Sequence, residues 1–556
     1  MGKRICCGVS SISFLIGAGL LIAGLVIVLN IYPNSLHNKY KDYKILGVNN
    51  DGTVNEFTDN WANRTYSNSA EFYVFNYTNI IAIMNRAVQP DVVECGPYVY
   101  DIVVKNDMVN FTSDGEKMTF HQTKTFVFNA DKSCRGCDPK QNRILIPDIG
   151  FQKGVDQIEN YLAILSKNPV AKQLCEKILN SEEKCKKVAV IIEEEIGTVM
   201  DVFGVSPFVN VTVDQLLFSG YTSPFMDKFI ETVLKIIFSY FQANPPALPN
   251  PPIQLMKNGT NGYLYTVLTG KTDAYKTGYI QSFVNTTSDV SNSTGNILPA
   301  SWWPSANESY CTKNPTYALR LDGTTADFFK VFVEKTATLP VFFDEYCRTL
   351  DLVYEKDVTV NDLNGYRFIV PASQFDYSLD NNCGFCVPLT HGLYEYPEKY
   401  KCLPSGLLDV SKCTGNPIVL SKPHFYQAAD VVKNFVPRFK ANYDKDETTF
   451  DIEPNTGILL AASKKTQTNM VVAQYTEIRS LSVMRPGAYP LMYKNEIITM
   501  DDKTKNHLND KFFTPKKTID IVCWIGVALG GVLLIFSAAL LFTTIFCFDK
   551  QVKKNS

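Results

Sequence analysis

The sequence predicts an α+β membrane protein, in which a large antiparallel β domain is held at both of its ends by transmembrane helices. Three observations lead to this prediction. An uncharged apolar segment lies near each end of the 556-residue chain, strand-like runs rich in Val, Tyr and Phe fill much of the interval, and four cysteines crowd into residues 383–413. A chain of this length can bury a sizeable core in one large domain or in several smaller ones.

The first apolar segment, Val9–Ile31, carries no charge over 23 residues. A helix of that length crosses about 30 Å of hydrocarbon, whereas the apolar core of a cleaved signal peptide spans about 7–15 residues. We therefore expect an uncleaved anchor. The second segment, Ile521–Phe548, is uncharged between Asp520 and Asp549 and predicts a second transmembrane helix. The expected organisation is tail 1–8, helix 9–31, ectodomain 32–519, helix 520–548 and tail 549–556.

Basic residues place both termini on the cytoplasmic side. Lys3 and Arg4 precede the first segment, and Lys550, Lys553 and Lys554 follow the second. Cytoplasmic flanks of membrane helices are enriched in Lys and Arg, although lysines also occur here on the opposite flanks. The last residues also resemble a dilysine retrieval signal, but an ordinary basic flank is the simpler interpretation.

The interval between the helices has the features of a secreted domain. It contains eleven of the fifteen cysteines, and disulfides persist in oxidising compartments. It also contains every N-x-Ser/Thr acceptor for N-glycosylation. These acceptors are Asn63, Asn76, Asn110, Asn210, Asn258, Asn285, Asn292 and Asn307.

Two features of the membrane segments suggest specific roles. Cys6 and Cys7 lie at the cytoplasmic end of the first helix, where palmitoylation is common; unmodified thiols are the alternative. Small residues one turn apart, Gly19 with Ala23 and Gly526 with Gly530, allow helices to approach closely.

Within the ectodomain the pattern changes twice. Residues 61–128 alternate as antiparallel strands, residues 154–242 show apolar residues at helical spacing, and strands return after a Pro-rich linker. The simplest architecture is one antiparallel barrel or sheet with a helical insertion. The charged face of that insertion is either a recognition surface or a solvated helix face.

Cys383, Cys386, Cys402 and Cys413 allow three interpretations. Four thiols that begin with C-x-x-C can bind zinc, and C-x-x-C can be a redox dithiol. The gap of ten residues between the second pair of cysteines weakens the interpretation as a zinc site, and no βαβ pattern supports a redox site. Structural disulfides are therefore favoured.

Composition argues against an enzyme and against nucleic-acid binding. The net charge is −2, and the five histidines lie in no metalloprotease, hydrolase or nucleotide-binding motif. We expect no catalytic residue, no metal site and no cofactor, and we interpret His424 as a buried structural histidine. A ligand-gated channel subunit shares the two-helix layout, but these helices lack the ionisable residues of a pore.

Eight stretches, in order along nearly the whole chain, resemble the class B scavenger receptor family, which includes fatty acid translocase and lysosomal integral membrane protein type 2. They are EFYVFNYTN (71–79), ECGPYVY (94–100), TVDQLLFSGYTSPF (212–225), YTVLTGK (265–271), EYCRTLDLVYEKDV (345–358), GYRFIVP (365–371), SKPHF (421–425) and DIEPNTG (451–457).

The resemblance implies three disulfides, Cys311–Cys383, Cys347–Cys413 and Cys386–Cys402, which would divide the C-x-x-C thiols between two bridges. Five ectodomain cysteines lie outside this pattern, so at least one stays free or pairs with another chain. Local pairs Cys134–Cys137 and Cys175–Cys185 are conceivable, which would leave Cys95.

The resemblance also implies a β-barrel with a hydrophobic tunnel and an apical helical bundle, here residues 154–242. It implies a receptor that binds lipid, lipoprotein or protein ligands at the apex and passes lipid through the tunnel, with homo-oligomers as a further option. The alternative is an endosomal or lysosomal protein that sorts a luminal hydrolase or exports sterol. The tail FDKQVKKNS lacks the acidic dileucine signal of the lysosomal member.

Overall fold

The computed structural model describes residues 2–63, 66–86, 88–155, 206–228, 251–285, 292–307, 311, 313–387, 402–473 and 482–552, together with 176–177, 180–184, 187, 204 and 235. The chain forms two compact units, residues 1–45 with 500–556 and residues 46–499.

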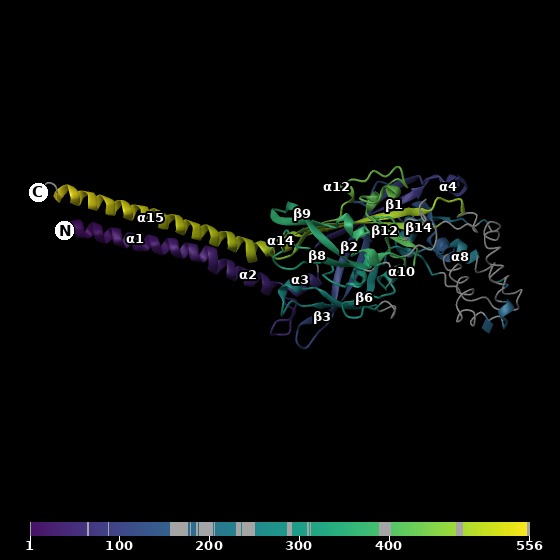
Figure 1. The fold of residues 1–556 in the computed structure, drawn as a ribbon, viewed down its shortest axis with the longest axis horizontal. Coiled ribbons are helices and arrows are strands. Elements are labelled where there is room, and N and C mark those ends of the chain that lie inside the picture. Colours follow the sequence, from purple (N-terminus) through teal and green to yellow (C-terminus); the bar gives the residue numbers. More distant parts are fainter. Residues whose placement is uncertain are drawn as a thin grey trace. The chain divides into compact units, whose positions relative to one another are not determined.

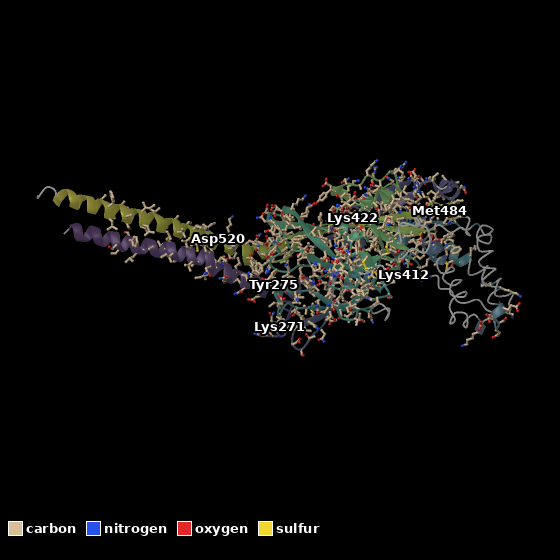
Figure 2. All side chains as sticks on the ribbon, in the orientation of Figure 1. Lys271, Tyr275, Lys412, Lys422, Met484 and Asp520 are labelled. Atoms are coloured by element: carbon tan, nitrogen blue, oxygen red, sulfur yellow. A yellow bond between two sulfur atoms is a disulfide. The ribbon has the colours of Figure 1, made fainter. Side chains whose placement is uncertain are left out.

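The first unit is helical and contains both apolar segments. Its elements are α1 Gly2–Val26, the π-helical η1 Ile27–Ile31, α2 Tyr32–Tyr43, α14 Asp502–Leu508, the π-helical η12 Asn509–Phe513 and α15 Thr514–Val552. Helices α1 and α15 lie side by side (Figure 1). From Ile521 to Thr543 the side chains of α15 are mostly apolar (Figure 2).

Glycines make the contact between α1 and α15. A Cβ on Gly17 would lie 2.9 Å from Cβ of Leu533, and one on Gly24 would lie 2.7 Å from Cγ2 of Val527. From the other side, a Cβ on Gly530 would meet the Leu21 nitrogen at 2.7 Å. The helices are thus packed too closely for side chains at these positions.

Of the small residues predicted to let the helices approach closely, Gly530 lies in the contact between α1 and α15, whereas Gly19, Ala23 and Gly526 do not. A Cβ on Gly19 or Gly526 would meet nothing within 4 Å, and Ala23 is exposed. Spacing by one turn shows which small residues share a face, but several faces of each helix carry them. Which face is used depends on the partner helix.

The second unit is built on a 13-stranded antiparallel sheet. Eleven strands follow the order β7-β6-β3-β2-β1-β15-β14-β13-β10-β9-β8, and β12 joins β14 and carries β11. A separate hairpin pairs β4 with β5. The strands are β1 Ser67–Tyr77, β2 Val92–Phe111, β3 Lys117–Phe128, β4 Arg143–Pro147, β5 Phe208–Thr212, β6 Gly259–Leu268, β7 Ile280–Asn285, β8 Leu339–Phe343, β9 Arg348–Val360, β10 Leu363–Ile369, β11 Leu408–Asp409, β12 Ile418–Ser421, β13 Thr449–Ile452, β14 Leu459–Val472 and β15 Gly487–Thr499.

Short helices connect these strands. The α-helices are α3 Glu56–Ala62, α4 Ile80–Arg86, α8 Pro224–Lys228, α10 Ser411–Thr414, α11 Asp430–Lys433 and α12 Tyr443–Asp446. The 3₁₀ and π turns are η2 Gln215–Ser219, η4 Ala274–Lys276, η6 Pro304–Asn307, η7 Pro315–Leu319, η8 Asp344–Tyr346, η9 Ala372–Phe375, η10 Cys383–Phe385 and η11 Pro423–Phe425.

The sheet curls into a nearly closed barrel, and a short segment joins its two edge strands. The backbone nitrogen of Ile280 in β7 donates to the oxygen of Gly323 at 2.8 Å, and that of Phe342 in β8 donates to Thr324 at 2.9 Å. The rings of Phe283 and Phe342 stack across this seam, with centroids 5.6 Å apart. Residues 323–324 therefore bridge the edges. The predicted α+β class with an antiparallel barrel is confirmed.

An aromatic cluster forms one part of the barrel core. Phe72 in β1 contacts Tyr100 in β2 and Phe126 in β3, with centroids 5.5 and 6.2 Å apart. Phe218 in η2 contacts Phe126 at 5.3 Å. Burial of each aromatic ring stabilises the fold by about 1.5–3 kcal/mol. The alternation of apolar residues along these strands determines which face of the sheet is buried.

The predicted apical region, residues 154–242, lies mostly outside the described residues. Where the chain enters it, residues 149–155 are helical. The Asp148 carboxylate accepts a hydrogen bond from Ser223 Oγ at 2.6 Å. The rings of Phe151 and Phe225 lie 4.8 Å apart. These contacts join the entry of the region to α8.

The structure contains the disulfides Cys311–Cys383, Cys347–Cys413 and Cys386–Cys402, the same pairs that the resemblance implies. It also pairs Cys134 with Cys137. Because Cys383 and Cys386 are bonded to different partners, the C-x-x-C motif is not a redox dithiol in this structure. Cys95 is free and half-buried, and Cys175 and Cys185 lie outside the described residues.

Candidate ligand cavities in the barrel

Two adjoining cavities lie among the strands of the barrel. The larger has a volume of about 410 Å³ and the smaller about 60 Å³. The residues that line both are Gln122, Lys124, Asp344, Glu345, Thr466 and Lys494. The larger volume falls within the range of about 300–1,000 Å³ that is usual for small-molecule sites.

Apolar side chains form much of each wall. In the larger cavity these are Phe126, Leu255, Met256, Tyr263, Val410, Ile418, Leu420 and Met492. In the smaller cavity they are Val104, Tyr265, Phe342, Phe343, Tyr346, Leu350, Val370, Phe375 and Ile498. Walls of this kind suit a hydrocarbon chain.

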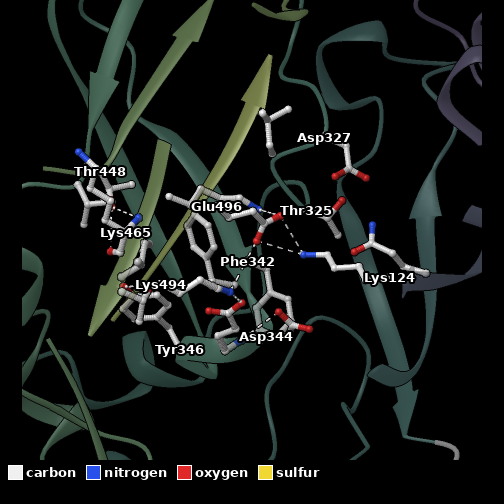
Figure 3. Close-up of a pocket in the computed structure, with 18 of the residues that line it drawn as sticks. Lys124, Thr325, Asp327, Phe342, Asp344, Tyr346, Thr448, Lys465, Lys494 and Glu496 are labelled. Atoms are coloured by element: carbon white, nitrogen blue, oxygen red, sulfur yellow. Dashed lines mark hydrogen bonds and ion pairs between the residues drawn. The ribbon is translucent and has the colours of Figure 1, made fainter. Parts of the chain in front are cut away.

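The cavities are nevertheless more polar than the tunnel that the resemblance implies, because an ionic cluster lies on their shared wall. Its centre is the carboxylate of Glu496 in β15, and it includes Lys124 from β3, Lys464 from β14, Lys494 from β15 and Glu345 from η8. Figure 3 shows Lys124 pointing across the cavity toward Glu496. Sequence analysis did not identify these residues.

Distances define how the cluster is connected. Nζ of Lys124 lies 3.2 Å and Nζ of Lys464 lies 3.0 Å from the same oxygen, Oε1 of Glu496. Nζ of Lys494 lies 3.6 Å from Oε2 and also pairs with Glu345. Glu496 and Lys494 are each only 4% exposed, so the carboxylate that the three ammonium groups share is shielded from solvent.

This arrangement sets the charge of the cluster. Burial by itself would raise the pKa of Glu496, but the three lysines outweigh it and hold this pKa well below its usual value. Burial lowers the pKa of Lys464. For Lys494 the attraction of Glu345 and Glu496 exceeds the effect of burial and raises the pKa. The carboxylate is therefore ionised at all physiological pH values.

One amide in the smaller cavity has an unused acceptor. Asn68 in β1 is 7% exposed and lines that cavity, and its side-chain oxygen has no hydrogen-bond partner among the residues that the structure describes. A buried polar atom left without a partner costs about 1–3 kcal/mol, so such an atom in a cavity wall is a candidate ligand contact.

His424 is buried outside these cavities, as a structural histidine. Its Nδ1 lies 2.8 Å from Oδ1 of Asp446, and its Nε2 lies 2.7 Å from Oε2 of Glu94. Tyr493 donates to the other Glu94 oxygen at 3.0 Å. Burial lowers the pKa of His424, but the two carboxylates outweigh it and raise this pKa to about 9. Both imidazole nitrogens are thus donors in an ion-paired network.

We expect His424→Gln to lower the free energy of unfolding by about 3 kcal/mol near neutral pH, because it leaves two carboxylates without their cation. The folded-state pKa exceeds the unfolded value of about 6.5, so this contribution is complete below about pH 6.5. It is lost as the pH rises through about 9. Thermal unfolding of the full chain in detergent at several pH values measures the difference.

The control is His121→Gln, since His121 makes one hydrogen bond with the Tyr263 carbonyl at 3.1 Å. We expect that variant to lose about 1 kcal/mol or less. A difference between His424→Gln and the natural protein that stays constant from pH 6 to about 10 contradicts the ion-pair interpretation.

The glycosylation sites remain predictions. The side chains of Asn63, Asn110, Asn210 and Asn258 are exposed, whereas Asn76, Asn285 and Asn292 are half-buried. Asn285 also lines the larger cavity. The side chain of Asn307 lies outside the described residues.

Other sequence predictions also stay open. The side chains of Cys6 and Cys7 and the backbone of Lys553 and Lys554 lie outside the described residues, so palmitoylation and retrieval are untested. Among the described residues, no three His, Cys, Asp or Glu side chains are grouped as metal ligands.

Two helical stretches are long and apolar enough to cross a membrane, Ser11–Tyr43 and Asp502–Thr543. The sequence pattern of the CD36 family matches residues 15–541, almost the entire chain including most of both stretches. The chain belongs to the CD36 family. This agrees with the resemblance to class B scavenger receptors, and this member is an integral membrane protein.

Relatives with curated sequences cover almost all of this CD36-family chain. It is 52% identical to an uncharacterized protein of Caenorhabditis elegans over the full length of both. It is 28% identical to lysosome membrane protein 2 of Homo sapiens, over 85% of this chain and 84% of that protein. It is 23% identical to sensory neuron membrane protein 2 of Anopheles gambiae, over 95% and 92% respectively.

Proposed function

We propose that this CD36-family protein is a scavenger-type receptor that binds lipid, lipoprotein or particle ligands and transfers lipid through the interior of its barrel. The observation that supports this best is the pair of adjoining cavities inside a nearly closed sheet. An acyl chain held there avoids water, which is worth about 0.8 kcal/mol for each CH₂ group. We propose no catalytic activity.

We propose that the apical region, residues 154–242, captures the ligand. We also propose that both termini lie in the cytoplasm. This orientation places the barrel and its glycosylation sites in an oxidising compartment, in keeping with the disulfides. Assembly into homo-oligomers is a further proposal. Native mass spectrometry of the full chain would identify co-purifying lipid and the number of copies.

A second candidate function is that of an endosomal or lysosomal protein that sorts a luminal hydrolase or exports sterol. The 28% identity to a lysosome membrane protein favours this candidate. Microscopy of a tagged full-length chain distinguishes the two: plasma-membrane residence supports the surface receptor, and endolysosomal residence supports the second candidate.

We expect Leu255→Trp to lower lipid uptake by cells that express the chain by about tenfold. Leu255 lines the larger cavity and is half-buried in a segment outside the strands, so an indole can fill the cavity with little strain on the sheet. Overpacking of this kind costs a ligand about 1–3 kcal/mol, and 1.4 kcal/mol corresponds to a tenfold change. Uptake of a fluorescent fatty acid, normalised to the amount of mature protein, measures the effect.

The matched control is Leu379→Trp, because Leu379 is 42% exposed and does not line the cavities. Its uptake should equal that of the natural protein. Normal uptake by Leu255→Trp at normal expression would argue against transfer through the barrel.

A further inference from the structure

The ionic cluster of Lys124, Lys464, Lys494, Glu345 and Glu496 lies where the two cavities meet. Lys124 and Lys494 line both cavities, whereas Lys464 and Glu496 line the smaller one. Any molecule that extends from one cavity into the other therefore passes the ammonium group of Lys124. The cluster is thus placed to sort ligands by the charge of their polar ends.

Within the cluster, hydrogen-bond donors outnumber the acceptors that they share. Lys124 and Lys464 direct their ammonium groups at one oxygen of Glu496, 3.2 and 3.0 Å away. An ammonium group carries three N–H donors, so both lysines keep donors for an additional acceptor. Lys124 is 27% exposed, which makes it the most accessible of the three lysines.

The carboxylates of the wall are already engaged by the protein. Glu345 pairs with Lys494, Asp344 accepts a hydrogen bond from the backbone nitrogen of Glu345 at 3.0 Å, and Asp327 accepts one from the indole nitrogen of Trp61 at 3.3 Å. Glu345 and Glu496 compensate the buried lysines when no ligand is present. An anionic group can then join Glu496 at Lys124 and Lys464 without leaving a new charge unpaired.

Two neighbouring features complete the site. The side-chain oxygen of Asn68 is buried in the same smaller cavity and has no partner within the described part of the chain, and its amide can rotate to present either a donor or an acceptor. Phe126, Tyr263 and Met492 line the larger cavity together with Lys124. A polar end at the cluster would therefore continue into an apolar compartment.

We propose that Lys124 and Lys464, with Asn68, form a head-group site that selects anionic single-chain amphiphiles over neutral and cationic ones. This inference rests on the proposed transfer of lipid through the barrel, and it adds the residues that determine which lipids are accepted. The head-group is a carboxylate or a phosphate, and the acyl chain lies in the larger cavity.

The test uses the full chain in nanodiscs of zwitterionic lipid, labelled with a photoreactive analogue of palmitate. Unlabelled palmitate, palmitoyl lysophosphatidate, hexadecanol and hexadecylamine compete for the site. A charged hydrogen bond is worth about 1.5–3 kcal/mol, so both anions should compete at concentrations at least about tenfold lower than hexadecanol, and the amine should be weakest. The order of the two anions distinguishes a fatty acid from a lysophospholipid ligand.

Variants locate the effect. Lys124→Met should bring palmitate to the level of hexadecanol and leave hexadecanol unchanged. Lys124→Arg should retain the preference. The control is Lys105→Met, because Lys105 is 60% exposed and pairs with Asp107 on β2.

Equal competition by palmitate, hexadecanol and hexadecylamine in the natural protein overturns the head-group site but leaves lipid binding in the barrel intact. Absence of labelling in barrel peptides contradicts the proposed function itself. Because the series with the natural protein needs no variant, it decides the question even where Lys124→Met does not fold.

Discussion

Gly323→Ala is expected to open the barrel seam and to lower the free energy of unfolding by about 3 kcal/mol or more. Gly323 has φ +78°, and its carbonyl accepts the hydrogen bond from β7 that joins the two edge strands. A Cβ there would lie 1.8 Å from the Pro340 oxygen and 2.3 Å from its carbonyl carbon. Both atoms belong to the backbone of β8, so β8 itself would have to move.

The measurement is the thermal unfolding midpoint of the full chain in detergent, together with the fraction of protein that acquires mature glycans in cells. The matched control is Gly52→Ala, because Gly52 has φ +84° but a Cβ there meets nothing within 4 Å. That variant bears only the backbone strain, about 1–2 kcal/mol. If the two variants unfold at the same temperature, the contact with Pro340 does not hold the seam.

The strands of the barrel could be predicted because their evidence is local. Alternating apolar residues, turn residues and aromatic content mark each strand. The resemblance to the family then implied that the strands form a barrel. The seam could not be predicted from these patterns. Residues 323–324 lie in a segment without strand alternation, and their importance depends on two edge strands that are distant in sequence.

The ionic cluster left only a weak trace in the sequence. Lys494 and Glu496 are two residues apart in a largely apolar strand, so they share a face, and Lys464 is the direct cross-strand partner of Glu496. Charged residues at inward positions were the available signal. It could not show that Lys124, some 370 positions before Glu496, reaches the same carboxylate, because side-chain reach across a barrel depends on its curvature.

His424 shows the opposite case. The lack of a nearby metal-ligand or nucleophile motif sufficed to predict a structural histidine. Its partners, however, come from β2 and α12, and no periodicity relates them to SKPHF. The sequence could therefore predict a structural role for His424. It could not predict that the imidazole is protonated, because that depends on the two carboxylates that the fold brings next to it.

Glu496→Gln should lower the free energy of unfolding by about 3–5 kcal/mol at neutral pH, because it leaves buried ammonium groups around a neutral amide. The pKa of Glu496 is held well below its usual value of about 4.3, so its contribution is complete above about pH 5. It is lost only as the pH falls through the folded-state pKa. The deficit should therefore be equal at neutral pH and at mildly acidic endosomal pH, measured as a shift in the thermal midpoint.

The comparison pair for this variant is Lys335–Asp357, whose side chains are 46% and 62% exposed. Asp357→Asn should leave the free energy of unfolding almost unchanged, because solvent screens an exposed pair. Adding Lys464→Met to Glu496→Gln should restore part of the lost stability, since it removes one uncompensated cation next to the amide. If Glu496→Gln loses no stability, or if the double variant recovers none, water already screens the charges of the cluster. These lysines would then bind an anionic ligand little more strongly than lysines exposed on the surface.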